Sequence, residues 1–314
     1  MQHLLAARLF WFLTMIWGVA TIAFLLARAA PGDPAELFLE RAHGRPPTDE
    51  QVAAMRREMG LERPILVQYV TWLAGLARGD LGQSWATGQP VAEALAAGIP
   101  PTVALAAAAQ LLTLVVGIPL GVAAAARPGA WLDQLSRALA VTSASIPTFV
   151  LGYVMILLFA VTLGLLPVFG TGSPAHLVLP AVTLALGSAA TYARVVRASM
   201  LTTLQEEYIR AASARGVTSR SVLARHALPN ALLPVFTMAA LSLGHLLGGA
   251  VVVEWVFSWP GLGRLTIESI AARDYPLVQG IIVLAAAIFG VVNVLADLAL
   301  GWIDPRVTLA QRVP

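Results

Sequence analysis

The sequence reads AASARGVTSRSVLARHALP from Ala211 to Pro229, and this basic segment interrupts an otherwise apolar chain. It contains three arginines, a histidine and, near its middle, a glycine. Residues 138–193 before it are uncharged, and residues 227–253 after it contain no arginine or carboxylate. Long apolar stretches on both sides of a short basic turn are typical of a polytopic membrane protein, because charged residues collect in the water-exposed turns.

The composition indicates the same class of protein. Hydrophobic residues make up 58% of the 314 residues and charged residues 12%, and the mean hydropathy is +0.77. Soluble domains contain about 25% charged residues, so a water-soluble fold of this length could not cover its surface. We therefore expect an all-α integral membrane protein, because a helix satisfies its own backbone hydrogen bonds within the bilayer.

Several functions are excluded by the residue types that the chain lacks. All 20 basic residues are arginine, and the chain has neither lysine nor cysteine. Without lysine it cannot form a phosphate-binding P-loop or a Schiff base, so we expect any ATP hydrolysis to lie on another chain. Without cysteine it has no thiolate metal site, and we expect no metal site and no cofactor here. The net charge of +3 gives no case for nucleic-acid binding.

Uncharged stretches of membrane-spanning length predict six transmembrane helices. Four of these stretches are residues 9–26, 94–126, 227–253 and 275–296. The stretch 138–193 is long enough for two helices, with a break at GLLPVFGTGSP, Gly164–Pro174, where proline and glycine cluster. The first stretch exceeds the apolar region of a signal peptide, so we expect a retained helix.

The distribution of arginine predicts the orientation in the membrane. With the N-terminus inside, the inner segments hold eleven arginines and the short outer segments hold three. Because short cytoplasmic loops are enriched in arginine, we expect both termini to be cytoplasmic. The predicted parts are an N-terminal transmembrane helix at 1–30, a long external loop with short helices at 31–101, a transmembrane core at 102–302 with a cytoplasmic segment at 205–230, and a cytoplasmic tail at 303–314.

Two short helices are predicted in the external loop. PPTDEQVAAMRREMG has Thr48 as an N-cap, acidic residues in the first turn and Gly60 after its end. ILVQYVTWLAGLARG predicts an amphipathic helix that ends at Gly79, and its apolar face fits either the membrane surface or the helix bundle.

The basic segment itself predicts a helix, a turn and a second helix. Gly216 indicates the turn, and the second helix is expected to begin near Thr218 or Ser219. Arginines recur every five residues, which corresponds to about 140° per step on a helix, so they cannot form one stripe. Charge alone could serve only to fix topology, but a compact helix–turn–helix is also a shape that another protein can bind.

The spacing within this segment resembles the signature of ATP-binding-cassette (ABC) importer permeases. That signature reads E-A-A, three residues, Gly, nine residues and I-x-L-P, and it marks the loop that docks on the ATPase. Here Ala211-Ala212 precede Gly216 at the same spacing, but Arg210 replaces the Glu and His226 replaces the Ile. Both departures, within YIRAASARG and RHALPNALLP, are similar to the dipeptide, oligopeptide and nickel branch of the family.

The resemblance extends over nearly the whole chain, through APGDP, GLERPILVQYVTWL, RGDLGQSW, PPTVALA, VEWVFSWPGLGRL, RDYPLVQG and IDPRV. It implies the type I ABC importer permease fold in a bacterial inner membrane, surrounded by membrane lipid. It also implies a second homologous permease subunit, two ATP-binding subunits that hold ATP and Mg, and an extracytoplasmic solute-binding protein.

The resemblance also implies roles for particular residues. The ATPase-coupling residues would be Arg210, Ala211, Ala212, Arg215, Gly216, His226, Leu228 and Pro229. An outer loop near the binding protein would contain Glu254, Trp259, Pro260, Gly261 and Gly263. Met238 and His245 lie seven residues apart in one predicted span and are candidates for the substrate path. Alternatively, His245 is a neutral residue bonded to a neighbouring helix and Met238 only packs.

Two other functions fit the composition less well. An ion-coupled carrier working alone would normally need carboxylates within the spans, and the predicted spans before Arg194 contain none. A membrane enzyme would need a motif such as H-E-x-x-H or G-x-S-x-G, and neither occurs. Within the importer interpretation, dipeptides, oligopeptides and nickel chelates all remain candidate cargo, and residues 46–64 are faintly similar to nickel permeases.

Overall fold

The computed structural model of the chain describes the backbone of residues 2–303 and the side chains of residues 8–143, 145–239, 242 and 250–295. Within this part the regular structure is helical, apart from an isolated antiparallel bridge between Gln83 and Pro90. The expected all-α class is confirmed. The chain forms two compact units, Met1–Pro100 with Arg264–Gly290 (unit 1) and Pro101–Gly263 with Val291–Pro314 (unit 2).

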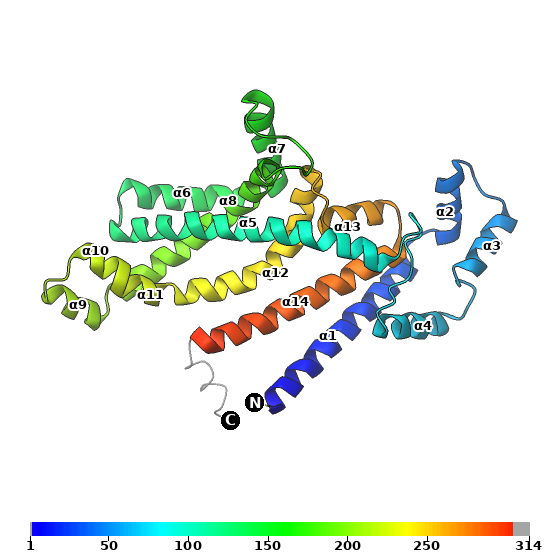
Figure 1. Ribbon diagram of the computed structural model, residues 1–314, viewed down its shortest axis with the longest axis horizontal. Coiled ribbons are helices and arrows are strands. Elements are labelled where there is room, and N and C mark those ends of the chain that lie inside the picture. The colour runs from blue at the N-terminus through cyan, green and yellow to red at the C-terminus, as the bar shows by residue number, and fades with distance from the viewer. Residues whose placement is uncertain (1, 304–314) are drawn as a thin grey trace. The chain divides into compact units, whose positions relative to one another are not determined.

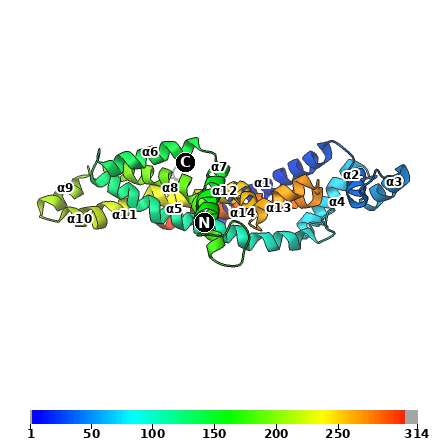
Figure 2. The same ribbon diagram turned by 90° about the horizontal axis from the view of Figure 1, so that it is seen from above.

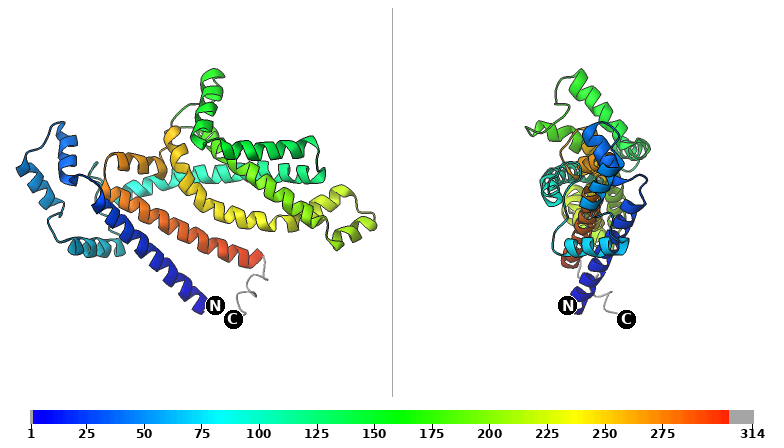
Figure 3. Two further views of the ribbon diagram at one scale, coloured as in Figure 1. Left: turned by 180° about the vertical axis from the view of Figure 1, so that it is seen from behind. Right: turned by 90° about the vertical axis from the view of Figure 1, so that its right-hand side faces the viewer.

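Unit 1 contains the N-terminal helix and the short helices that follow it. Its elements are α1 (Gln2–Ala29), α2 (Pro34–His43), α3 (Asp49–Glu58), α4 (Ile65–Ala77), the beginning of α5 (Val91–Ala126), most of α13 (Leu262–Ala271) and the first half of α14 (Tyr275–Ile303). Within unit 1, α1 and the early part of α14 lie side by side (Figure 1, Figure 3). Phe12 of α1 packs directly against the backbone of Gly290 in α14, where a Cβ would collide with its ring.

Local signals explain how the short helices of unit 1 begin and end. Thr48 caps α3 as predicted: its Oγ1 accepts a hydrogen bond from the Gln51 amide, and Gln51 Oε1 accepts one from the Thr48 amide. This is a capping box. The amphipathic helix expected after it is α4, which is followed by Gly79 at φ +80.

Unit 2 is built around α8. Its elements are the rest of α5, α6 (Trp131–Ser145), α7 (Thr148–Met155), the π-helical turn η1 (Ile156–Thr162), α8 (Ala175–Thr203), α9 (Glu207–Ala214), α10 (Ser219–Ser221), the π-helical turn η2 (Val222–Ala227), α11 (Leu228–Ala231) and α12 (Leu233–Val256). Figure 1 and Figure 2 show α5, α6 and α8 running close to one another in this unit.

Two glycines let α5 approach α8 closely. A Cβ on Gly117 would lie 2.9 Å from the carbonyl oxygen of Ala189, and one on Gly121 would lie 2.6 Å from that of Ala193. Small residues four apart on one helix face allow this kind of backbone contact in membrane proteins. The close contact fixes α8, from which the basic segment continues.

The described helices account for four to five of the six predicted spans. Residues 8–29, 91–126, 175–203 and 275–295 are each long and apolar enough to cross a membrane, and the bent pair 131–143 and 148–162 would be a fifth span. The expected span 227–253 falls mainly on α12, several of whose side chains lie outside the described residues. The count of six and the cytoplasmic termini therefore stay predictions, and residues 304–314 of the expected tail lie outside the described part.

Two boundaries differ from the expectation. The chain breaks at Ile146–Pro147 in addition to the predicted break at Gly164–Pro174, and Ile146 is extended with φ −97 and ψ 121. Proline lacks an N–H and disfavours helical geometry in the residue before it. Also, α5 begins at Val91, three residues before the uncharged stretch 94–126 that predicted this span.

Candidate functional site

The basic segment folds into the expected helix–turn–helix at one end of unit 2 (Figure 2). α9 ends at Ala214, Gly216 adopts the left-handed φ of +83, and α10 begins at Ser219 after Thr218. A Cβ at Gly216 would meet no atom within 4 Å. Glycine is therefore needed for its backbone conformation and not for space, because other residues are strained at such a φ.

The inner face of the segment is buried on the end of α8. Ile209 and Ala212 of α9 and Val222 of η2 lie in one apolar cluster with Val196 and Met200 of α8, and all five side chains are buried. Contacts of this kind make the segment one packed body with α8.

Hydrogen bonds close the two arms of the segment on each other. The Tyr208 hydroxyl donates to the carbonyl of His226 at 3.3 Å. Asn230 Nδ2 donates to the Tyr208 hydroxyl at 2.7 Å and to the same carbonyl at 3.3 Å. Side chains from both arms thus meet at one backbone acceptor, the His226 carbonyl, three residues before Pro229.

The outer face of the segment carries its charge. The exposed members of the predicted coupling set are Arg210, Ala211, Arg215, Gly216 and Pro229, together with Arg220 and Arg225. His226 and Leu228 are half-buried, while Ala212 is buried in the apolar cluster and belongs to the inner face. The surface offered to another protein is therefore a cationic one around a glycine turn.

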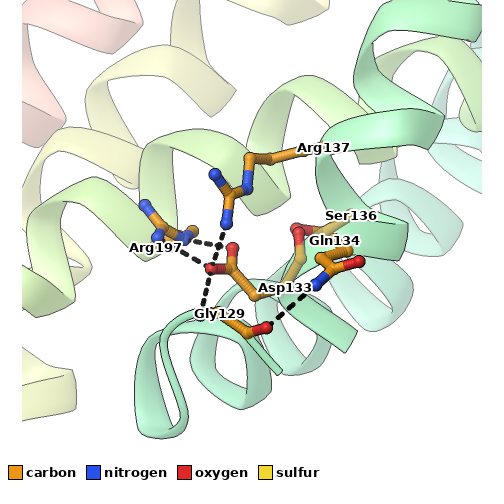
Figure 4. Close-up of polar contacts among 6 residues, drawn as sticks. All are labelled: Gly129, Asp133, Gln134, Ser136, Arg137 and Arg197. Carbon is orange, nitrogen blue, oxygen red and sulfur yellow. Dashed lines mark hydrogen bonds and ion pairs between the residues drawn. The ribbon is translucent and has the colours of Figure 1, made fainter. Parts of the chain in front are cut away.

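A buried carboxylate beside this segment joins α6 to α8 (Figure 4). Asp133 Oδ1 accepts from Arg197 Nε at 2.6 Å, and its Oδ2 accepts from Arg197 Nη2 at 2.9 Å. Oδ2 also accepts from Arg137 Nη2 at 2.7 Å and from the Gly129 amide at 2.8 Å. The Asp133 side chain is 0% exposed. A bidentate arginine–carboxylate pair fixes distance and orientation together.

This cluster lies close to the start of the basic segment along the chain. Arg197 is less than two turns before Thr203, where α8 ends, and α9 follows at Glu207. In the sequence, Arg137 and Arg197 indicate only topology, and Asp133 carries no expected role. The one local signal was the acid four residues before Arg137, which is a helix pair spacing.

The outer-loop residues form an interior corner. Glu254, Trp259, Gly261 and Gly263 are buried, and only Pro260 of that predicted set is exposed. The Gly263 amide donates to Glu254 Oε2 at 2.7 Å, and a Cβ on Gly261 would collide with both oxygens of Glu254.

Thr102 on α5 completes this corner. Its Oγ1 donates to Glu254 Oε1 at 2.6 Å and accepts from the Leu262 amide at 2.8 Å. Trp259 Nε1 donates to the carbonyl of Pro101 at 2.9 Å. These contacts give the four buried residues a structural function, and binding-protein docking by this loop stays a prediction for its exposed part.

The substrate-path candidates lie near a polar group in unit 2. Met238 is half-buried against the cluster on α8, and the side chain of His245 lies outside the described residues. One turn from Met238, Ser242 Oγ lies 2.7 Å from the Tyr192 hydroxyl and donates to Gln110 Oε1 at 3.0 Å. These polar groups satisfy one another between three helices, and the described residues contain no group of three potential metal ligands.

Comparison with known proteins identifies the family. Residues 117–309 match the family described as "binding-protein-dependent transport system inner membrane component", and residues 1–106 match its N-terminal family. The chain belongs to this family of inner-membrane permeases. It is therefore a transmembrane permease subunit of an ABC importer in the bacterial inner membrane, as the resemblance implied.

Relatives of the permease are similar over almost their whole length. It is 40% identical over 297 residues to a probable peptide ABC transporter permease of Sinorhizobium fredii, covering 92% of this chain and 94% of the relative. It is 39% identical over 290 residues to the glutathione transport system permease protein GsiC of Salmonella typhimurium, covering 92% and 93%. The corresponding Escherichia coli protein is 38% identical over 308 residues, covering 98% and 99%.

Solved structures agree with the permease fold. The methionine ABC transporter MetNI, in an inward-facing conformation, matches with a TM-score of 0.58 at 24% identity, covering 67% of the permease and 96% of that chain. An amino acid ABC transporter crystallised with histidines matches with a TM-score of 0.50 at 17% identity, covering 68% and 94%. Nothing in the family or in these folds supports the ion-coupled carrier.

Proposed function

We propose that the permease forms half of a pore with a second homologous permease. One of two ATP-binding subunits would dock on residues 205–230, and the other would dock on the second permease. The observation that carries this proposal is the geometry of that segment: a cationic helix–turn–helix whose inner face is buried on α8. ATP and Mg²⁺ would bind the partner subunits, because the permease has no lysine for a P-loop. The permease itself would be non-catalytic.

The packing suggests how an ATPase movement would reach the membrane helices. A docked partner would move α9 and η2 as one body with α8, because Ile209 and Val222 are buried in one cluster with α8. The bidentate pair between Asp133 and Arg197 would carry α6 along. Small shifts at a docking site become rigid-body rotations when the elements between are tightly packed.

We propose short peptides as the cargo. The named relatives transport peptides or glutathione, itself a small peptide, and they cover more than nine-tenths of the chain. An extracytoplasmic binding protein would select the cargo and deliver it. Calorimetry of that binding protein with dipeptides, glutathione, Ni²⁺ and metal–histidine complexes tests the assignment, and heat released only with the nickel ligands would contradict it.

Gly216→Pro is the direct test of the coupling segment. Proline fixes φ near −65°, whereas Gly216 has φ +83, so the turn cannot form and the segment should lose its docking shape. We expect membrane insertion at normal levels, with transport of a peptide reduced at least about tenfold and ATP hydrolysis no longer stimulated by cargo. The measurements are uptake and ATPase activity of the assembled transporter in vesicles.

A matched pair of alanine variants separates docking from backbone strain. Gly216→Ala and Gly44→Ala both place a Cβ at a left-handed residue with no atom within 4 Å, so each costs about 1–2 kcal/mol locally. Only Gly216→Ala should lower transport. Normal uptake by Gly216→Pro at normal expression would contradict the coupling assignment.

A further inference from the structure

The helix α4 has an apolar face that the described part of unit 1 leaves uncovered. Ile65, Leu66, Val67 and Val70 are 60%, 72%, 45% and 56% exposed. No charged residue occurs from 64 to 77, whereas charged residues lie on both sides of this range. A 13-residue helix is about 20 Å long, which is too short to cross a hydrocarbon core about 30 Å thick.

The side of α4 that carries Tyr69 and Trp72 lies against a membrane-spanning helix. The rings of Tyr69 and Trp72 lie 5.3 and 5.7 Å from the ring of Phe24 in α1, centroid to centroid. The Tyr69 hydroxyl is 2.8 Å from the hydroxyl of Thr21. Phe24 itself is buried. α4 is therefore attached to α1 by side chains and not merely tethered by the chain.

These contacts define the level of α4 along α1. The apolar span of α1 extends from Arg8 to Ala29, and Thr21 is about 12 Å before its end at 1.5 Å per residue. At this level α1 exposes Ile22, Leu25 and Leu26 to more than half of their surface. At the level where they touch, both α4 and the transmembrane helix α1 therefore leave apolar side chains uncovered.

A cavity of about 320 Å³ lies between α1, α4, the loop after α4 and the start of α14, all within unit 1. Its lining includes Arg28, Arg63, Asp80, Trp72, Trp85 and Tyr275. Because Arg28 is at the end of the span, the cavity lies at the level of lipid headgroups, where tryptophan and tyrosine are enriched.

The charges in this cavity have both signs. The Arg28 guanidinium lies over the Phe24 ring, 5.4 Å from its centroid, and the described residues give it no ion pair. Arginine is suited to phosphate because its donors form a planar fork. Asp80 uses Oδ1 to accept from the Gly82 amide at 2.9 Å, and its negative charge suits an ammonium group.

We propose that α4, which belongs to the predicted external segment 31–101, lies within the membrane leaflet on that side. We propose also that the cavity beside α4 binds the head of a zwitterionic phospholipid, with Arg28 at the phosphate and Asp80 at the ammonium group. An amphipathic helix that buries its apolar face among acyl chains is a known mode of membrane attachment. This inference does not depend on the cargo or on the ATPase-docking assignment.

The depth of α4 can be measured by lipid quenching, because the chain has no cysteine of its own. Leu66→Cys would carry a bimane label, with Leu25→Cys on α1 as the lipid-facing control and Ala53→Cys on the exposed α3 as the aqueous control. In the assembled transporter, reconstituted with phospholipid brominated on its acyl chains, Leu66 should be quenched to at least about half the extent of Leu25 and several-fold more than Ala53. Quenching of the Leu66 label equal to that of the Ala53 label would overturn the proposal. A Leu66 label that neither the lipid quencher nor an aqueous quencher reaches would also overturn it, and would indicate that protein covers this face of α4.

The headgroup site is tested by the lipid that remains bound to the purified transporter. After reconstitution in equal phosphatidylethanolamine and phosphatidylglycerol, native mass spectrometry should show retained phosphatidylethanolamine, reduced at least about threefold by Arg28→Gln and by Asp80→Asn. Arg57→Gln on the exposed α3 is the matched control and should retain the wild-type amount. Equal retention by all four proteins, or no preference between the two lipids, would overturn the headgroup assignment.

Discussion

Asp133 and Glu254 are both fully buried carboxylates in unit 2, and they are satisfied by different kinds of donor. Asp133 accepts hydrogen bonds from the guanidinium groups of Arg137 and Arg197. The described hydrogen bonds to Glu254 come from a hydroxyl group and a backbone amide. The first site therefore depends on charge, whereas the donors at the second need an oxygen acceptor of the right shape.

The difference corresponds to what each site joins. The Asp133 cluster links α6 to α8 less than two turns before α8 ends, so it holds the two helices together ahead of the proposed coupling segment. Glu254, near the end of α12, accepts hydrogen bonds from the Gly263 amide in the turn 259–263 (WPGLG) and from Thr102 of α5. It therefore holds this turn against α12 and α5. A bidentate ion pair suits two helices that are proposed to move as one body, and uncharged donors around one carboxylate suit a turn that keeps its shape.

Asp133→Asn should have the largest effect of the carboxylate variants. An asparagine offers one oxygen in place of two, and its NH2 group would face guanidinium donors that cannot accept a hydrogen bond. We expect the largest fall in the thermal unfolding midpoint of the purified transporter. We also expect more ATP to be hydrolysed per peptide transported, because α6 would no longer move together with α8.

Glu268→Gln is the control for Asp133→Asn, since Glu268 pairs with Arg264 at 2.7 Å with both side chains partly exposed. Exposed pairs contribute about 0.5 kcal/mol or less, so this variant should unfold and transport as the wild type does. If Asp133→Asn changed neither the thermal unfolding midpoint nor the ATP hydrolysed per peptide transported, the Asp133 cluster would contribute to neither stability nor coupling.

Glu254→Ala should have the next largest effect. It leaves the Thr102 hydroxyl and the Gly263 amide without their carboxylate acceptor, and each buried unsatisfied group costs about 1–3 kcal/mol. We expect a lower unfolding midpoint than for Glu268→Ala, with unchanged coupling in the protein that remains folded. Loss of coupling at normal stability would instead assign the corner to the transport cycle.

The features that could be predicted from the sequence are those with a local signal. The apolar stretches, the break at Gly164–Pro174, the cap at Thr48 and the glycine turn at Gly216 all lie within a few residues of the structure they produce. Each depends on backbone geometry or on the period of one helix. The family signature was readable for the same reason, because its spacing follows one helix–turn–helix.

The two carboxylate sites could not be read in this way. Asp133 meets Arg197 across 64 positions, and Glu254 meets Thr102 across 152, so both depend on how helices pack. The glycines of the WPGLG turn did indicate a tight turn, but the sequence could not show that the turn closes over a buried carboxylate. The family resemblance implied an outer loop near the binding protein, and Glu254 and Gly263 of that loop are interior.

Glu254→Gln should have the smallest effect, and it isolates shape from charge. The glutamine Oε1 can accept from the Gly263 amide, and its Nε2 can donate to Thr102 Oγ1, which also accepts from the Leu262 amide. Only the Thr102 O–H then loses the acceptor that Glu254 Oε1 provides, whereas Glu254→Ala leaves both donors without one. We expect an unfolding midpoint much closer to wild type than that of Glu254→Ala, whereas the same acid-to-amide change at Asp133 should be severe. If Glu254→Gln were as destabilised as Glu254→Ala, the corner would need a negative charge after all, and the two sites would follow one principle.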